Sequence, residues 1–403
     1  MKRLAIILLV LIFLINIGVG IANSLLGAAW PAISLDLSIP ISYQSAIIIT
    51  FFIGTTIGAT YAQRIIARLL TFMPIILGGV LIGLTLFVFS ISKSFILMSL
   101  IAAFTGLGVG FIQATINGYV TKHYNTSAIN WLHGFFGIGC SLAPVLLAYY
   151  IGVHNSWAMG YQVTAIIEIA LVVLLIISYP LWKIHGTVIP RLSATSRSDD
   201  DKVSIVNAKS IKELFVSKGT KGVVLLMFVY ASFESVIVFW TTSYLVVVKD
   251  LVEASAAGMM VYFYGGQVLG RVISGFIVLK ISDTKLIRLC QIITFILVVL
   301  LFFAPSSMFA LIFGLIGIAA GPIFPNLVHE APSIVGKENA QGVIGLQIAA
   351  AYVSSIVMPL VFSIFTRGFG FEIYPIFLVI LLIASFLLKL LLDRRRNSGV
   401  LKQ

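Results

Sequence analysis

Apolar runs long enough to cross a lipid bilayer recur along almost the whole of this 403-residue chain. A membrane-spanning helix needs about 20 mostly apolar residues. Only 10% of the residues are charged and 60% are hydrophobic, whereas roughly a quarter of a soluble domain is charged. The excess apolar surface must therefore face lipid, which excludes an ordinary soluble fold.

The runs predict an all-α membrane protein with twelve transmembrane helices, six on each side of a polar stretch at 184–220. We interpret 1–183 as an N-terminal six-helix bundle, 184–220 as a cytoplasmic linker and 221–403 as a C-terminal six-helix bundle. The first run resembles a signal peptide, but its length favours a retained helix. The expected spans are 4–29, 43–66, 72–91, 95–119, 129–152, 160–183, 221–247, 254–280, 285–304, 308–329, 340–366 and 371–392.

Basic residues divide unequally between alternate loops, which orients the predicted helices. With the N-terminus inside, the outer loops hold only Lys93, Lys249 and Arg367, and the other basic residues of the loops fall inside. Such an excess marks the cytoplasmic side. We therefore expect a multi-pass protein of the cell inner membrane, monomeric in the lipid bilayer, with both termini cytoplasmic. This distribution explains the net charge of +12 without a nucleic-acid partner.

Small residues, an amide and a proline recur in the two halves at a spacing near half the chain length. This internal repeat indicates duplication and two pseudo-symmetric bundles around a central cavity. The pairs are Gly54 with Gly266, Gly58 with Gly270, Gly108 with Gly317, Asn117 with Asn326, and Pro144 with Pro359.

Three motifs allow comparison with a known family. They are Gly106 to Asn117 continued by Asn130-Trp131-Leu132-His133; Tyr230-Ala231-Ser232-Phe233-Glu234 with Trp240; and Gly266-Gln267-Val268-Leu269-Gly270-Arg271 with Gly321 to Asn326. On these motifs the chain resembles the major facilitator superfamily, and within it the sugar and proton symporters similar to fucose permease. The resemblance implies the major facilitator fold, in which the first, fourth, seventh and tenth helices line a central cavity.

Two departures separate the chain from this pattern. Fucose permease carries a glutamate at the position of Gln113 and an aspartate on its first helix, whereas 4–29 here contains no acidic residue. The loop after the second helix keeps Arg64 and Arg68 but lacks the aspartate of the superfamily pattern. The proton-handling pair of that relative therefore does not carry over. Proton coupling through other residues, sodium coupling and uniport all stay open.

Two carboxylates stand inside predicted spans, where a charge is costly and indicates a functional residue. Glu234 lies near the middle of the seventh predicted helix, and burial there favours the protonated form that a proton carrier needs. We predict that Glu234 is the coupling residue. It could instead hold a cation, accept bonds from substrate hydroxyls or make a structural hydrogen bond. Glu168 lies on the sixth helix, at the periphery of the implied fold, and receives no role.

Amide side chains on the cavity-lining helices suit sugar hydroxyls, because each amide both donates and accepts hydrogen bonds. For every amide a structural bond between helices is the alternative. Trp240 could stack on a sugar ring or anchor its helix at the membrane interface. Arg64, Arg68 and Arg271 are predicted to gate the cytoplasmic side. The predicted substrate-binding residues are Asn23, Gln113, Asn117, His133, Trp240, Gln267, Asn326 and Gln347.

These features favour a secondary active transporter that moves a small polar solute, with a sugar preferred, by alternating access. A proton or sodium ion is the expected coupling ion. The sequence contains no ATP-binding loop, metal-ligand set or catalytic cluster, so we expect no cofactor, no metal and no enzymatic activity. Two alternatives stay open: a drug or metabolite exporter of the same fold, with a more apolar and aromatic cavity, and a sensor that binds sugar without exchanging it.

Overall fold

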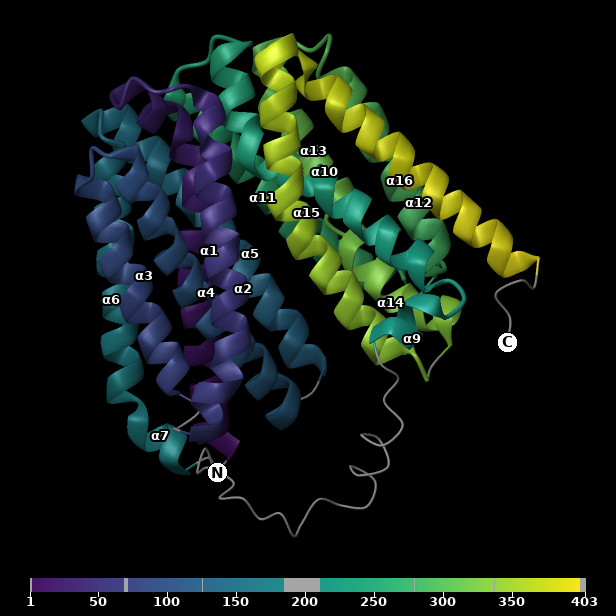
Figure 1. The fold of residues 1–403 in the computed structure, drawn as a ribbon, viewed down its shortest axis with the longest axis horizontal. Coiled ribbons are helices and arrows are strands. Elements are labelled where there is room, and N and C mark those ends of the chain that lie inside the picture. Colours follow the sequence, from purple (N-terminus) through teal and green to yellow (C-terminus); the bar gives the residue numbers. More distant parts are fainter. Residues whose placement is uncertain are drawn as a thin grey trace.

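The computed structural model describes residues 2–68, 72–124, 126–184, 211–278, 280–336 and 338–398. All regular structure in these residues is helical (Figure 1). Before the linker the helices are α1 (Lys2–Asp36), η1 (Ile41–Tyr43), α2 (Gln44–Arg68), α3 (Met73–Ile91), α4 (Phe95–His123), α5 (Thr126–His154), α6 (Trp157–Ile177) and α7 (Tyr179–Ile184). After it they are α9 (Ile211–Val216), α10 (Thr220–Val247), α11 (Glu253–Ile277), α12 (Asp283–Leu300), η2 (Ser306–Met308), α13 (Phe309–Ala320), α14 (Ile323–Val335), α15 (Ala340–Phe369), η3 (Phe371–Ile373) and α16 (Tyr374–Asn397).

Ten spans within the described residues are long and apolar enough to cross a membrane. They cover all six spans expected before the linker and four of the six expected after it. The segments expected at 254–280 and 285–304 form α11 and α12, which do not meet this measure. Polar residues explain the difference, because α11 contains Gln267 and Arg271 and the first turns of α12 contain Lys285 and Arg288.

Proline-containing junctions divide two of the expected helices. The span expected at 160–183 forms α6 and α7, which separate near Pro180, and the span expected at 308–329 forms α13 and α14, which separate at Gly321 and Pro322. Proline has no amide hydrogen to donate and fits best in the first turn of a helix. Each junction proline therefore favours the start of a new helix over continuation of the old one.

Helices before the linker pack mainly with one another, and so do the helices after it (Figure 1). We call these sets the N-terminal and C-terminal groups. Their buried apolar side chains form two clusters, one drawn mostly from residues 8–182 and the other mostly from 214–392. Phe52, Cys140 and Ala257 belong to the cluster of the opposite group, so they mark surfaces where the groups meet.

The two groups are joined at one end and diverge at the other. At the joined end, Ser363 Oγ donates to the carbonyl oxygen of Ser42 at 2.9 Å, and a Cβ on Gly152 of α5 would lie 3.2 Å from Ala254 of α11. Toward the end that contains the N-terminus and α9, the helices of the two groups spread apart (Figure 1). The joined end carries the loops that the pattern of basic residues places outside the cell.

Two glycines allow the backbones of α2 and α4 to touch. A Cβ on Gly54 would lie 1.9 Å from the carbonyl oxygen of Ala103, and a Cβ on Gly106 would lie 1.9 Å from that of Phe51. Both distances are far inside van der Waals contact, and a backbone oxygen cannot rotate away as a side chain can. Small residues at such crossings are typical of helix pairs packed in membranes.

We expect Gly54→Ala to reduce the free energy of unfolding by about 1–3 kcal/mol, the usual cost of overpacking a close-packed interior. Thermal unfolding in detergent would show this as a lower Tm. Gly134→Ala is the matched control, because a Cβ there meets nothing within 4 Å and alanine favours a helix more than glycine does. Equal Tm values for the two variants would contradict the close approach of α2 and α4.

Candidate functional site

A chain of amide side chains connects α4, α1 and α5 in the N-terminal group. Asn117 Nδ2 donates to Gln113 Oε1, and Gln113 Nε2 donates to Asn16 Oδ1, both at 3.0 Å. Asn16 Nδ2 then donates to the carbonyl oxygen of Leu132 at 2.6 Å. Asn16 is fully buried, whereas Gln113 and Asn117 are half-buried. Among the described residues, one hydrogen of Gln113 Nε2 and the Oδ1 atom of Asn117 have no partner, so both can bind a solute.

The amides of this chain follow the spacing of one helix face. Gln113 and Asn117 lie four residues apart on α4, which stacks their side chains one turn above each other. This spacing also lets Asn117 Nδ2 donate to the backbone carbonyl of Gln113 at 2.8 Å. Both hydrogens of that amide are therefore used within α4, and the side chain is held in one orientation.

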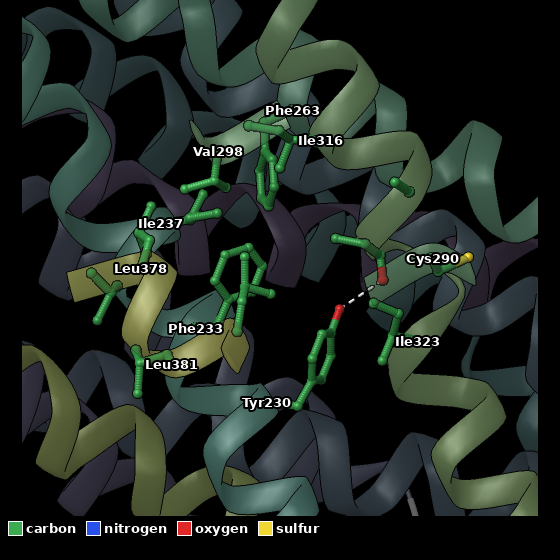
Figure 2. Packing of buried hydrophobic residues seen from close by; sticks show 14 of the residues in the cluster. Tyr230, Phe233, Ile237, Phe263, Cys290, Val298, Ile316, Ile323, Leu378 and Leu381 are labelled. Carbon is green, nitrogen blue, oxygen red and sulfur yellow. Dashed lines mark hydrogen bonds between the residues drawn. The ribbon is translucent and has the colours of Figure 1, made fainter. Parts of the chain in front are cut away.

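Glu234 of α10 is held by neutral side chains of the C-terminal group. Its Oε1 accepts a hydrogen bond from Gln267 Nε2 of α11 at 2.8 Å and lies 3.2 Å from the Tyr230 hydroxyl, one turn earlier on α10. The Tyr230 hydroxyl also donates to the carbonyl oxygen of Ala320 at 2.6 Å, the bond drawn in Figure 2. Tyr230 is fully buried among apolar residues, whereas Glu234 is half-buried. The carboxyl is thus fixed in place at the edge of the C-terminal core.

Arg271 of α11 lies where the two groups meet. Its Nε donates to the carbonyl oxygen of Gly321 at 3.3 Å, and its Nη1 lies 3.8 Å from the position that a Cβ on Gly137 of α5 would take. Arg271 follows Gln267, the hydrogen-bond partner of Glu234, by one turn of α11. The bare backbone at Gly137 therefore makes room for a cation at the boundary between the two groups.

These polar side chains form two sets, one in each helix group, with Arg271 at the boundary between the groups; together we call them the central polar site. The amide chain ends at the backbone of the buried Leu132, whereas the side chain of the next residue, His133, is exposed. Most of the site consists of residues predicted from the sequence. Its members are Asn16, Gln113, Asn117, His133, Glu234, Gln267 and Arg271.

Trp240 and Asn23 lie apart from the central polar site. Trp240 is fully buried, and its ring packs 5.4 Å from Phe362 and 5.7 Å from Phe371. In this conformation it is an element of the aromatic core and offers no face to a sugar. Asn23 is half-buried and lines a small cavity together with Tyr161 of α6, residues of α2, α3 and α4, and Phe239 of α10 from the C-terminal group.

Asn326 and Gln347 make structural bonds in the C-terminal group. Asn326 is buried and donates to the carbonyl oxygen of Pro322, one turn earlier, at 2.6 Å. Gln347 of α15 is buried and donates to the carbonyl oxygen of Leu327 at 3.3 Å, while its own Oε1 has no described partner. The bond of Gln347 joins α15 to α14.

The predicted arginine gate is only partly described. Arg64 is exposed near the end of α2, and its guanidinium stacks over the Tyr61 ring at 4.8 Å. The side chain of Arg68 lies outside the described residues. Arg271 belongs to α11, and its guanidinium lies against Gly137 of α5.

A buried ionic cluster in the C-terminal group was not predicted from the sequence. Lys389 is fully buried, and its Nζ lies 2.7 Å from Glu330 Oε2 and 2.6 Å from Asp393 Oδ1. Arg288 pairs with Asp393 at 2.6 Å, and Arg396 pairs with Glu330 at 2.9 Å. The expected spans 308–329 and 371–392 end one residue before these two carboxylates, so the prediction left both in loops. Among the described residues, these two and Glu168 are the buried acidic side chains.

Comparisons with known proteins agree with this architecture. The sequence model described as Major Facilitator Superfamily matches residues 12–280 and 250–403. A curated relative, the glucose/mannose transporter GlcP of Bacillus subtilis, is 21% identical over 346 residues, which cover 84% of this chain and 81% of the relative.

Solved structures show the same fold. A bacterial homologue of the human lysosomal transporter Spinster, in an inward-facing and unoccupied conformation, matches with a TM-score of 0.78 at 14% identity and covers 99% of this chain and 98% of its own. The peptide transporter POT in complex with sulfate matches with a TM-score of 0.70 at 11% identity, over 97% and 94% of the two chains. The chain therefore belongs to the Major Facilitator Superfamily, and it is a multi-pass membrane transporter rather than an enzyme.

Proposed function

We propose that this transporter carries a sugar by alternating access and couples its movement to protons through Glu234. The observation that supports the proposal is the central polar site, to which the N-terminal group contributes a chain of amides and the C-terminal group contributes Glu234 with its partner Gln267. A sugar that leaves water must replace the hydrogen bonds of its hydroxyl groups, and the free positions on Gln113 and Asn117 offer such bonds. The similarity to a transporter named for glucose and mannose supports the same class of substrate.

The arrangement of the two groups supports alternating access. They are joined through Ser42 and Ser363 at one end and spread apart at the other (Figure 1). We assign the joined end to the outside and both termini to the cytoplasm of an inner-membrane protein, as the basic residues favour. Residues 1–183 and 221–403 are then the two moving halves of a monomer, and the conformation faces the cytoplasm. Arg271, between the halves, is the proposed gate residue.

The hydrogen bonds of Tyr230 support a proton, rather than sodium, as the coupling ion. A phenol hydroxyl has one hydrogen to donate, and the carbonyl oxygen of Ala320, at 2.6 Å, can only accept it. With that hydrogen used, the Tyr230 oxygen can only accept at its second contact, 3.2 Å from Glu234 Oε1. The carboxyl can donate there only when it carries a proton. Gln267 can donate to the carboxyl in either state. The pocket around Glu234 therefore suits a group that gains and loses a proton.

Counterflow in proteoliposomes tests the sugar proposal. We expect vesicles loaded with an unlabelled hexose to take up the labelled form, and Gln113→Ala to raise the KM about tenfold, the effect of losing a hydrogen bond worth about 1.4 kcal/mol. The maximal rate should change little, because the amide acts in binding. Gln162→Ala, an amide on α6 outside the central polar site, is the control. Exchange of none of a panel of sugars would overturn the proposal and favour the exporter; binding without exchange would favour the sensor.

A further inference from the structure

Glu168 is buried without a partner, unlike the other buried acidic side chains of the described residues. It is 2% exposed on the buried face of α6, and its Oε1 accepts no hydrogen bond from the described residues. An ionised carboxylate left alone in an apolar interior is strongly destabilising. The side chain therefore needs a proton to remain where it lies, and the proposed coupling at Glu234 makes no use of that proton.

No charged side chain of the described residues faces Glu168 from the helices packed around it. Helices α3 and α6 contain no other Asp, Glu, Lys, Arg or His. On α1, Asp36 lies at the C-terminal end, far along the helix from Gly18, and pairs with Lys93 at 2.7 Å. On α5, His133 is exposed, and His154 stacks on Tyr150 at the end of the helix. Tyr161, on α6 itself, is the titratable group on the same face.

The carboxyl of Glu168 presses directly on α1. A Cβ on Gly18 would lie 2.7 Å from Oε1 and 3.0 Å from Oε2, so the carboxyl fills the space of a side chain at that position. Two residues earlier, α1 contributes Asn16 to the central polar site. Further along, a Cβ on Gly27 would lie 2.4 Å from the carbonyl oxygen of Val238 in α10. One helix thus connects Glu168, the amide chain and the opposite group.

A small cavity lies along α6 from Glu168. Its volume is about 30 Å³, and its polar lining comes from Asn23, Thr105 and Tyr161. This is room for about two water molecules. Tyr161, Thr164 and Glu168 share the buried face of α6, and about 10 Å of helix axis separates Tyr161 from Glu168. The cavity therefore lies about two turns of α6 from the carboxyl, and a proton can pass between them only when α1 and α6 part and water enters the space along α6.

We propose that Glu168 is a second proton-binding site, which holds its proton while α1 packs against α6 and exchanges it with water of the cavity at Tyr161 when the two helices part. Loss of the proton places an unpaired charge against the α1 backbone and favours a conformation with α1 displaced. Because α1 carries Asn16, loss of the proton from Glu168 changes the affinity of the central polar site for its solute. Solute binding changes the affinity of Glu168 for its proton by the same factor. This inference goes beyond the coupling role of Glu234, and only its transport test rests on the proposed function.

Infrared spectroscopy of the purified full-length protein tests the site without any substrate. The carbonyl band of a protonated carboxyl should be present at neutral pH and should lose one component in Glu168→Gln. Glu253→Gln, which changes a half-buried glutamate in the first turn of α11 in the same way, should keep that component. An unchanged band in Glu168→Gln would overturn the proposal. Glu168→Met serves if the glutamine variant does not fold, because its side chain needs no hydrogen-bond partner.

The pH profile of exchange tests the link to α1. Wild-type exchange is expected to change by up to about tenfold per pH unit where Glu168 titrates, the limit for one proton. In Glu168→Gln and Glu168→Met, which resemble the protonated state, that part of the profile should be flat. A wild-type profile in both variants would show that Glu168 is only a packing residue. Failure of the sugar proposal would instead remove exchange from every variant and leave the infrared result unchanged.

Discussion

Replacement of Glu234 by glutamine is expected to abolish accumulation of sugar against its gradient while exchange continues. Glutamine keeps the size of the side chain, and its Nε2 can donate both to the Tyr230 oxygen and, once the Gln267 amide turns over, to Gln267 Oε1, so the site should keep its shape. It cannot lose or gain a proton at neutral pH. The accumulation ratio in proteoliposomes with an imposed proton gradient should fall to about one, the value without coupling, and counterflow should remain within about threefold of the wild type, less than a typical hydrogen bond contributes.

Two comparisons make this result specific to the carboxyl. Glu253→Gln removes a glutamate outside the central polar site and should leave accumulation unchanged. Gln267→Leu removes a donor to Glu234 but keeps the carboxyl, so it should weaken coupling without abolishing it. Accumulation that persists in Glu234→Gln under a proton gradient would exclude Glu234 as the coupling group. Accumulation driven by sodium alone would replace the proton in the proposal.

The sequence predicted the helical fold well because the bilayer restricts it so strongly. Each span must be long, apolar and internally hydrogen-bonded, so α1, α4 and α10 are evident from hydropathy alone. The differences lie at polar residues, where α11 and α12 form as helices but are less apolar than the other spans, and at prolines, where a predicted helix divides. The Gly321-Pro322 junction divides an apparent single span into α13 and α14, and periodicity does not reveal such a break.

The central polar site was predicted less completely, because tertiary packing decides which polar side chains meet. Gln113, Asn117, Glu234 and Gln267 could be named from the sequence, since each is a polar residue in an otherwise apolar helix, and their role in binding or coupling stays a prediction. Trp240 had the same sequence signature, yet it packs on aromatic rings of the C-terminal core. Hydropathy identifies a polar or aromatic residue at membrane depth, but only the neighbours show whether it faces a solute or another helix.

The buried ionic cluster is a set of residues that the sequence analysis did not identify, because tertiary packing brings them together. Lys389 and Asp393 are four residues apart on α16, a spacing that permits an ion pair within one helix. That spacing is visible in the sequence and could have identified the pair. Glu330 comes from α14, and no local pattern links it to α16. A polar cluster formed by three helices becomes evident only when the helices are placed.

Lys389→Met is expected to destabilise the protein by about 3–5 kcal/mol, the usual effect of breaking a buried ion pair by removing one partner. Lys389 is fully buried and lies within 2.7 Å of both Glu330 and Asp393. Its loss leaves two buried carboxylates with only the partly exposed Arg288 and Arg396 to balance them. Thermal unfolding in detergent should show a much lower Tm than the wild type.

The matched control separates burial from simple loss of charge. Arg395→Met removes an exposed cation from the same helix and should change the free energy of unfolding by less than about 0.5 kcal/mol. Lys389→Met combined with Glu330→Gln should recover part of the lost stability, because it removes a carboxylate together with its partner. The cluster joins α12, α14 and α16 within one helix group, so folded variants should keep the wild-type KM. A changed KM with an unchanged Tm would mean that the cluster acts in transport rather than in holding the C-terminal group together.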